Sequence, residues 1–284
     1  MDADTFRALA RSSPWRWRTV SFTCSWRGSH SGEPVRAWIQ RPGRMRVERL
    51  DGTLLQEGDD GAPQQFSFGW RDSSSGGSGA SFGWLAAPVT MLANEQGPAS
   101  ARAAAAAVPP PPEPRLRPDG LVAERRDYLF DYDAPMYQNY HWVAMLDPRE
   151  LTDGTDPDAA DPALLHPDGT RIESVREVDH HGRPAWEAVL APTTAYEPRC
   201  SCCPLLPSEQ ADLLEFGAAG RRQDGGYASA FRVRLDVGTG ICVLTDQLDG
   251  PRAGDGHEVR IEAVDQPIPA AGARAGAPER PGRG

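Results

Sequence analysis

The chain has 284 residues, of which 39% are hydrophobic, and its formal net charge is −10. This length allows one or two domains, and the acidic balance argues against a nucleic-acid binder because contact with phosphates needs a cationic surface. No segment approaches the ~20 apolar residues of a membrane span, and the N-terminus lacks the apolar region of a signal peptide, so we expect a cytoplasmic protein that does not span a membrane.

The N-terminal segment predicts a short helix followed by four antiparallel strands. Residues 1–10 combine early acidic side chains with apolar residues at helical spacing, which favours a helix. Between residues 15 and 56, apolar and polar residues alternate with the period of half-buried strands. The dipeptides Pro42-Gly43 and Asp51-Gly52 are typical of tight turns, so this segment is interpreted as a meander.

The middle of the chain is less regular. Segments at about 57–83 and 94–120, rich in Gly and Ser or in Ala and Pro, are interpreted as mobile insertions. Residues 136–146 have a spacing that is compatible with a helix or a strand. Pro148, followed by Glu150, predicts the start of a further helix.

The C-terminal half predicts a second meander that is interrupted by a helix. Two strands flank a turn at Gly182, and Ser208 is expected to cap a helix that ends at Gly217. Three further strands are predicted within residues 227–265. The tail, residues 267–284, consists mainly of Ala, Gly, Pro and Arg and is expected to be disordered.

Many short strands and few helices indicate a mainly β (α+β) fold, with one large curved antiparallel sheet in a single domain over residues 1–266. The segments WRWRTVSF, RMRVERLDGTLL, GRPAWEAVL and LDVGTGICVLTD resemble the outer-membrane lipoprotein carrier family and its relatives of the LolA, LolB and RseB type. The resemblance covers the two meanders, about half of the chain.

This resemblance implies an open half-barrel with helices packed on its concave face, an apolar cavity and no catalytic residues. The implied ligand is an acyl chain, a lipid or an apolar or lipidated peptide. Inward-facing residues of the first meander are expected to bind it. They are Val20, Phe22, Trp26, Val35, Ile39, Met45 and Val47.

Cys200, Cys202 and Cys203 form the densest cluster of reactive side chains. Zinc requires four tetrahedral donors. A fourth ligand would come from one of four other residues: His180, His181, Cys24 or Cys242. Cys200 and Cys203 also form a C-x-x-C pair, which would act as a dithiol if a helix N-terminus lowered the pKa of Cys203. We interpret the cluster as reduced or structural thiols, with zinc and the dithiol as alternatives.

Sequence motifs for the common enzyme classes are absent. No G-x-S-x-G, Walker A, G-x-G-x-x-G or H-E-x-x-H sequence occurs. The sequence therefore predicts a non-enzymatic binding or carrier protein for an apolar ligand. The alternative is a cytoplasmic interaction protein that uses the Cys200–Cys203 loop as a structural metal or thiol site and binds a protein partner.

Overall fold

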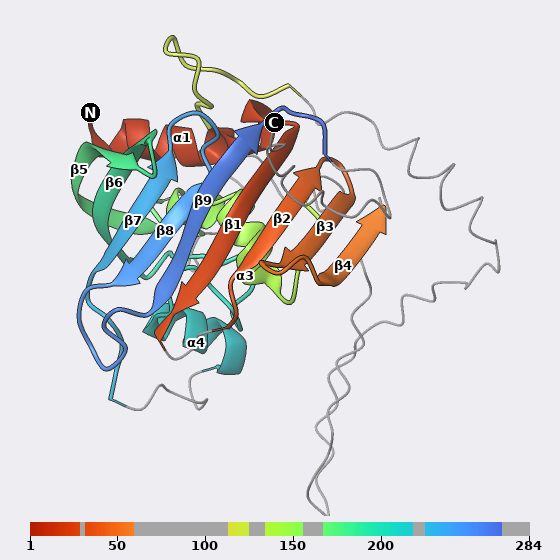
Figure 1. Cartoon of the computed structure of the whole chain (residues 1–284). Coiled ribbons are helices and arrows are strands. Elements are labelled where there is room, and N and C mark those ends of the chain that lie inside the picture. The colour runs from red at the N-terminus through yellow and green to blue at the C-terminus, as the bar shows by residue number, and fades with distance from the viewer. Residues whose placement is uncertain (29–31, 60–112, 125–133, 156–166, 218–224, 269–284) are drawn as a thin grey trace, which may run out of the picture.

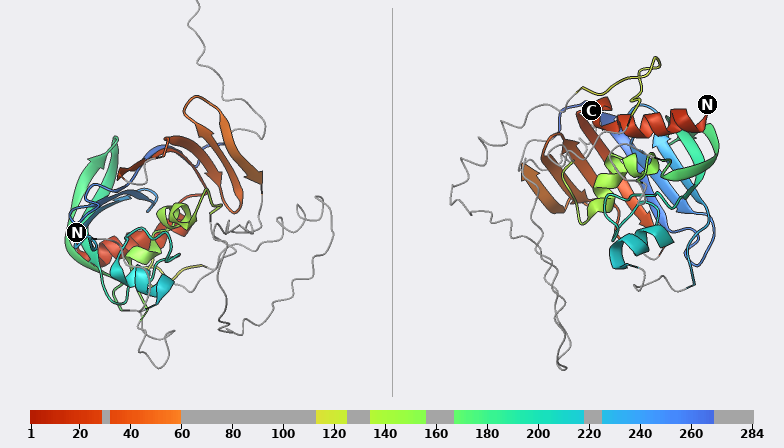
Figure 2. Two further views of the ribbon diagram at one scale, coloured as in Figure 1. Left: turned by 90° about the horizontal axis from the view of Figure 1, so that it is seen from below. Right: turned by 180° about the vertical axis from the view of Figure 1, so that it is seen from behind.

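The computed structural model describes residues 1–28, 32–59, 113–124, 134–155, 167–217 and 225–268. Within these ranges the chain forms one nine-stranded antiparallel sheet in the order β4-β3-β2-β1-β9-β8-β7-β6-β5. The sheet curves, and the helices lie inside its concave face (Figures 1 and 2). This confirms the predicted mainly β fold, with an open curved sheet and few helices.

The first meander has the four strands that the alternating pattern predicted. They are β1 (Thr19–Arg27), β2 (Val35–Gln40), β3 (Arg44–Arg49) and β4 (Leu54–Asp59). In β2 the alternation is strict, because Val35, Ala37 and Ile39 are buried and the residues between them are half-buried. Gly52 has φ +87°, which a tight turn between β3 and β4 requires and which glycine adopts without steric cost.

The second meander returns the chain to the first. Its strands are β5 (Thr170–His180), β6 (Arg183–Pro192), β7 (Phe231–Asp236), β8 (Cys242–Gln247) and β9 (Gly256–Val264). β9 pairs antiparallel with β1, from Val20 opposite Val264 to Arg27 opposite Gly256. The two meanders therefore share one continuous sheet.

Helix α1 (Ala3–Arg16) is longer than the helix predicted over residues 1–10. The Asp2 side chain caps it by accepting the Thr5 N–H at 2.8 Å. The extra turns contain Ser12 and Ser13, whose hydroxyls donate to the Ala8 and Leu146 carbonyls, both at 2.6 Å. Serine has a low helix propensity, so the contact with a residue distant in sequence stabilises this extension.

The remaining helices follow α1 along the concave face, with α4 at the opposite end of the strands (Figure 2). Residues 140–146 form α3 (Tyr140–Leu146), which decides the ambiguous pattern in favour of a helix. The helix predicted after Pro148 is only a 3-10 turn, η3 (Arg149–Leu151). As predicted, Ser208 caps α4 (Glu209–Phe216) and Gly217 follows it with φ +71°.

The two predicted insertions lie mostly outside the described residues. Their described parts are ordered: β4 continues to Asp59, and residues 113–124 form a turn with a bridge between Leu116 and Val122. The Val122 N–H donates to the Ser12 hydroxyl at 2.8 Å, so this turn packs on α1. Of the predicted tail, residues 269–284 lie outside the described ranges.

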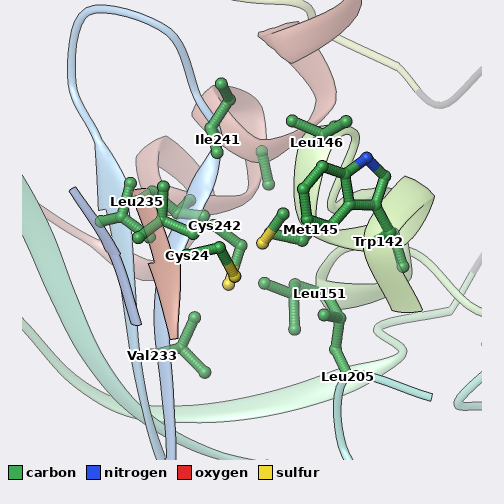
Figure 3. Packing of buried hydrophobic residues seen from close by; sticks show 14 of the residues in the cluster. Cys24, Trp142, Met145, Leu146, Leu151, Leu205, Val233, Leu235, Ile241 and Cys242 are labelled. Carbon is green, nitrogen blue, oxygen red and sulfur yellow. The ribbon is translucent and has the colours of Figure 1, made fainter. Parts of the chain in front are cut away.

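The hydrophobic core fills the space between the concave sheet face and the helices (Figure 3). Val233 and Leu235 face it from the sheet, and Met145 and Leu146 face it from α3. Large apolar side chains each contribute about 1.5–3 kcal/mol when they are fully buried, so this layer dominates the stability of the fold. Towards the end of the strands that lies near α4, the core gives way to a cavity.

Candidate functional site

A cavity of ≈590 Å³ lies between the ends of the central strands, α3, α4 and the loop that carries the cysteine cluster. Ligand sites in proteins typically measure about 300–1,000 Å³ and have a mainly apolar lining with a few polar groups. The apolar wall includes Trp26, Tyr137, Trp142, Met145, Leu205, Phe216 and Phe231. Polar side chains of the same wall include His141, Cys202, Cys203, Gln247 and Arg252.

Among the seven predicted ligand-binding residues, Trp26 lines this cavity. The other six are at most 2% exposed and belong to the core: Val20, Phe22, Val35, Ile39, Met45 and Val47. Phe22, for example, packs against Trp142 of α3 with 5.2 Å between the ring centroids. Period 2 identifies the inward face of a strand, but it does not show which part of that face the helices cover.

Glu150, in the 3-10 turn, is a buried carboxylate that holds the cysteine loop, residues 199–207. It is 1% exposed. Its Oε1 accepts the Tyr196 hydroxyl at 2.6 Å and the Leu205 N–H at 2.7 Å, and its Oε2 accepts the Arg199 N–H at 2.9 Å. Burial raises the pKa of Glu150, although these three donors oppose the shift. The sequence contains no local signal for this role because the partners are distant.

Within the cysteine loop, a turn closed by the Cys203 N–H and the Cys200 carbonyl at 3.2 Å brings the three sulfur atoms together. Cys200 Sγ lies 2.7 Å from Cys202 Sγ, and Cys202 Sγ lies 3.7 Å from Cys203 Sγ. All three sulfurs lie within 4.8 Å of one another, so the cluster could hold a metal ion. The residues that the sequence singled out do converge in space.

The three thiols differ in acidity. Hydrogen bonds from Cys203, and secondarily from Cys202, lower the pKa of Cys200 to about 5. Burial raises the pKa of Cys202 to about 11, and donation to Cys200 raises that of Cys203. Near neutral pH the cluster therefore holds one thiolate and two thiols. The dithiol alternative required a helix N-terminus to lower the pKa of Cys203, whereas here hydrogen bonds from the neighbouring thiols lower the pKa of Cys200.

The four residues considered as fourth ligands lie elsewhere. Cys24 and Cys242 are fully buried in the core. His180 and His181 form a separate group with Glu258, which could also hold a metal ion. Three ring nitrogens of His180 and His181 already have partners, however.

His180 Nε2 donates to the Val259 carbonyl at 2.9 Å, and His180 Nδ1 accepts from Arg234 at 3.2 Å. His181 contacts Glu258 at 3.0 Å. Burial lowers the pKa of His180, which agrees with a neutral ring in this position. Metal binding through His180 would displace either the Val259 contact or the Arg234 contact.

A pair of histidines connects the cavity wall to the core. His257 is fully buried and its Nε2 donates to the Cys242 carbonyl at 2.9 Å, so its Nδ1 is an acceptor. That Nδ1 lies 2.9 Å from His141 Nε2 and 3.0 Å from the Thr245 hydroxyl. His141 Nδ1 in turn lies 3.1 Å from the Pro204 carbonyl, next to the cysteines. Burial lowers the pKa of His257 to about 3.

Comparison with protein families, curated proteins and solved structures gave no match. The resemblance to lipoprotein carriers therefore stays a prediction. One fold can serve many functions, so the residues of the site are the better guide to function. In the described part of the chain, no helix is both long and apolar enough to cross a membrane.

Proposed function

We propose that this chain is a non-enzymatic binding or carrier protein that holds an apolar ligand in the cavity between the sheet, α3 and α4. The observation that carries the proposal is the ≈590 Å³ cavity with its aromatic wall. An acyl chain, a lipid tail or an apolar segment of a peptide fits this chemistry. We propose that it acts in the cytoplasm, which the odd number of cysteines supports.

The cavity also offers polar groups for one end of the ligand. His141, Gln247 and Arg252 share the wall with Trp26 and Phe231. Burial of apolar surface contributes about 25 cal/mol per Å², so the apolar part of the ligand would supply most of the affinity. The polar groups would orient the ligand, as the few polar groups of such sites generally do. We therefore propose a ligand with an apolar tail and a polar end.

Two residues of α4 provide a matched test. Phe216 and Leu214 are 48% and 53% exposed, and only Phe216 belongs to the cavity wall. The full chain is titrated with a fluorescent long-chain fatty acid, and quenching of tryptophan emission is followed. We expect saturable 1:1 binding that Phe216→Ala weakens roughly 5- to 30-fold, as expected when an apolar contact of about 1–2 kcal/mol is lost.

Leu214→Ala should bind like the wild type. Equal effects of the two α4 variants, or no saturable binding by the wild type, would refute the cavity proposal. Native mass spectrometry of the chain purified from cells is the complementary measurement. An adduct of acyl size that is lost on denaturation would identify the bound material.

A second candidate function is favoured by the convergence of Cys200, Cys202 and Cys203. In this account the chain is a cytoplasmic interaction protein, and the cysteine loop is a metal site, for zinc among others, or a thiol site that presents the loop to a protein partner. Replacing the three cysteines with serine should remove bound metal, measured by elemental analysis, and should weaken partner binding. Unchanged metal content and binding would exclude this function.

A further inference from the structure

We propose that Cys200, Cys202 and Cys203 form a three-coordinate thiolate site for a soft cation of the copper(I) class. This inference rests on the second candidate function and names the ion that the cysteine loop selects. It is independent of the proposal that the cavity binds an apolar ligand.

The cluster supplies three sulfur ligands, which suits a three-coordinate ion. The three sulfurs lie within 4.8 Å of one another, and no further Cys, His, Asp or Glu of the described residues joins them at that distance. Structural zinc sites are almost always four-coordinate and tetrahedral. Three thiolates leave a zinc ion one ligand short, whereas thiolate is the ligand that soft copper(I) prefers.

Other side chains that could supply a fourth ligand are buried elsewhere or already hydrogen-bonded. All five cysteines are described, and Cys24 and Cys242 are fully buried away from the loop surface. His141 lies beside the loop, but its Nδ1 faces the Pro204 carbonyl at 3.1 Å and its Nε2 faces His257 at 2.9 Å. Recruiting His141 would break one of these contacts.

The geometry of the loop suits three sulfur ligands. Metal–sulfur distances of about 2.3 Å place the sulfurs of a trigonal site about 4 Å apart. The sulfur pairs Cys200–Cys202 and Cys202–Cys203 are 2.7 Å and 3.7 Å apart, so small side-chain rotations would reach that spacing. Glu150 holds the backbone on either side of the cysteines through the N–H groups of Arg199 and Leu205.

The charge of the cluster and its access to solvent also favour cation binding. Binding of the cation would release the protons of the two remaining thiols, and its positive charge would offset the repulsion among the three thiolates that result. Cys202 is exposed, so an ion can reach the loop from solvent. The Glu215 carboxylate of α4 accepts the Ser201 hydroxyl, so this nearby carboxylate is also engaged and adds negative charge beside the loop. Cys202 and Cys203 also line the cavity, so an ion here would lie at its wall.

The test is an anaerobic titration of the reduced full chain with copper(I), in competition with a coloured copper(I) chelator. We expect one copper(I) per chain, ultraviolet absorption from sulfur-to-copper charge transfer, and no displacement by excess zinc(II). Cys202→Ser should lower the copper(I) affinity at least about tenfold, since even outer-sphere changes commonly cost 10- to 100-fold. Cys202 is exposed, so this variant should keep the fold, which circular dichroism verifies.

Cys24→Ala serves as the control, because it removes a thiol outside the loop and should leave copper(I) binding intact. Displacement of copper(I) by zinc(II), or equal affinity in Cys202→Ser and wild type, would overturn the inference. A chain that binds zinc(II) and no copper(I) would overturn it while supporting the second candidate function. If the chain binds neither ion, both this inference and the metal-site version of the second candidate function would be wrong. The fatty-acid titration reports separately on the cavity.

Discussion

Arg11 of α1 and Asp153 form a buried ion pair that no pattern in the sequence predicts. Arg11 Nε lies 2.6 Å from Asp153 Oδ2, Arg11 Nη2 lies 2.5 Å from Oδ1, and the two side chains are 8% and 10% exposed. The sequence places Asp153 at the start of an acidic, proline-containing segment that is typical of a solvated loop. Two parallel charge-assisted hydrogen bonds instead attach the chain after η3 to α1.

Removing one partner of this pair should be costly. Arg11→Met removes the cation that pairs with the buried Asp153 carboxylate, and we expect the free energy of unfolding to fall by about 3–5 kcal/mol. Denaturant titration followed by circular dichroism measures it. The matched control is Arg171→Met, whose partner Glu173 is solvent-exposed, with an expected loss below about 1 kcal/mol. Similar losses in the two variants would contradict a special role for the buried pair.

His257 predicts a pH dependence of stability. Its pKa is about 3 in the folded chain, below its ordinary value of 6.5, so the unfolded chain binds a proton that the folded chain excludes. This contribution is fully present above pH 6.5 and is lost as the pH falls towards 3, at about 1.4 kcal/mol per pH unit for one proton.

In His257→Gln, the unfolding free energy should change less steeply with pH between 6 and 4. The slope should be smaller by the contribution of one proton, about 1.4 kcal/mol per pH unit. Denaturant titrations at several pH values measure this slope, which is independent of any constant destabilisation by the substitution. An unchanged slope would show that His257 is not the group that titrates. His180, whose pKa burial also lowers, should retain its own contribution in this variant.

At the level of secondary-structure elements, loops and short turns carry the candidate sites. The 3-10 turn η3 places Glu150 under the cysteine loop, and the loop carbonyl of Pro204 contacts His141 of α3. The loop is therefore held by side chains of two different elements. Its backbone order should depend on Glu150 more than on its own sequence.

Glu150→Gln tests that dependence. The glutamine amide offers one acceptor oxygen where the carboxylate offers two, so at least one of the loop N–H groups faces another donor. We expect a loss of about 1–3 kcal/mol in stability and faster hydrogen exchange at the Arg199 and Leu205 amides. Glu177→Gln, at an exposed position on β5 outside the loop, is the control. If both amides stay protected from exchange in Glu150→Gln, Glu150 is not the residue that holds the loop backbone.

In the whole molecule, the pairing of β1 with β9 joins two meanders that are formed by opposite ends of the chain. The helices that cover them also contribute to one core, in which Phe22 of β1 contacts Trp142 of α3 and Val233 of β7 belongs to the same cluster. Among the described residues, buried apolar side chains of both meanders belong to this single cluster. The described chain should therefore unfold as one cooperative unit.

Phe22→Ala tests this cooperativity. It removes a fully buried aromatic side chain, and we expect a loss of about 3–5 kcal/mol. Hydrogen exchange should show the same loss of protection in β3 of the first meander and β7 of the second. Leu54→Ala, at a 47% exposed position on edge strand β4, should change stability by less than about 0.5 kcal/mol. Loss of protection confined to β3 would mean that the meanders unfold separately.

Local chemistry in the sequence was sufficient for the strands, the turns and the helix after Ser208. Period-2 alternation depends on neighbouring residues, and a glycine such as Gly52 or Gly217 supplies a positive φ by itself. The cysteine cluster was visible for the same reason, since its members lie within four positions of one another.

Tertiary structure alone decided the rest. The extension of α1 depends on the contact between Ser13 and Leu146. The cavity exists because strand ends meet α3 and α4, and the cysteine loop is held by Glu150. The members of each contact lie tens to more than a hundred positions apart. Side chains brought together by packing over such separations leave no periodic pattern, because each local segment is compatible with several partners until the core forms.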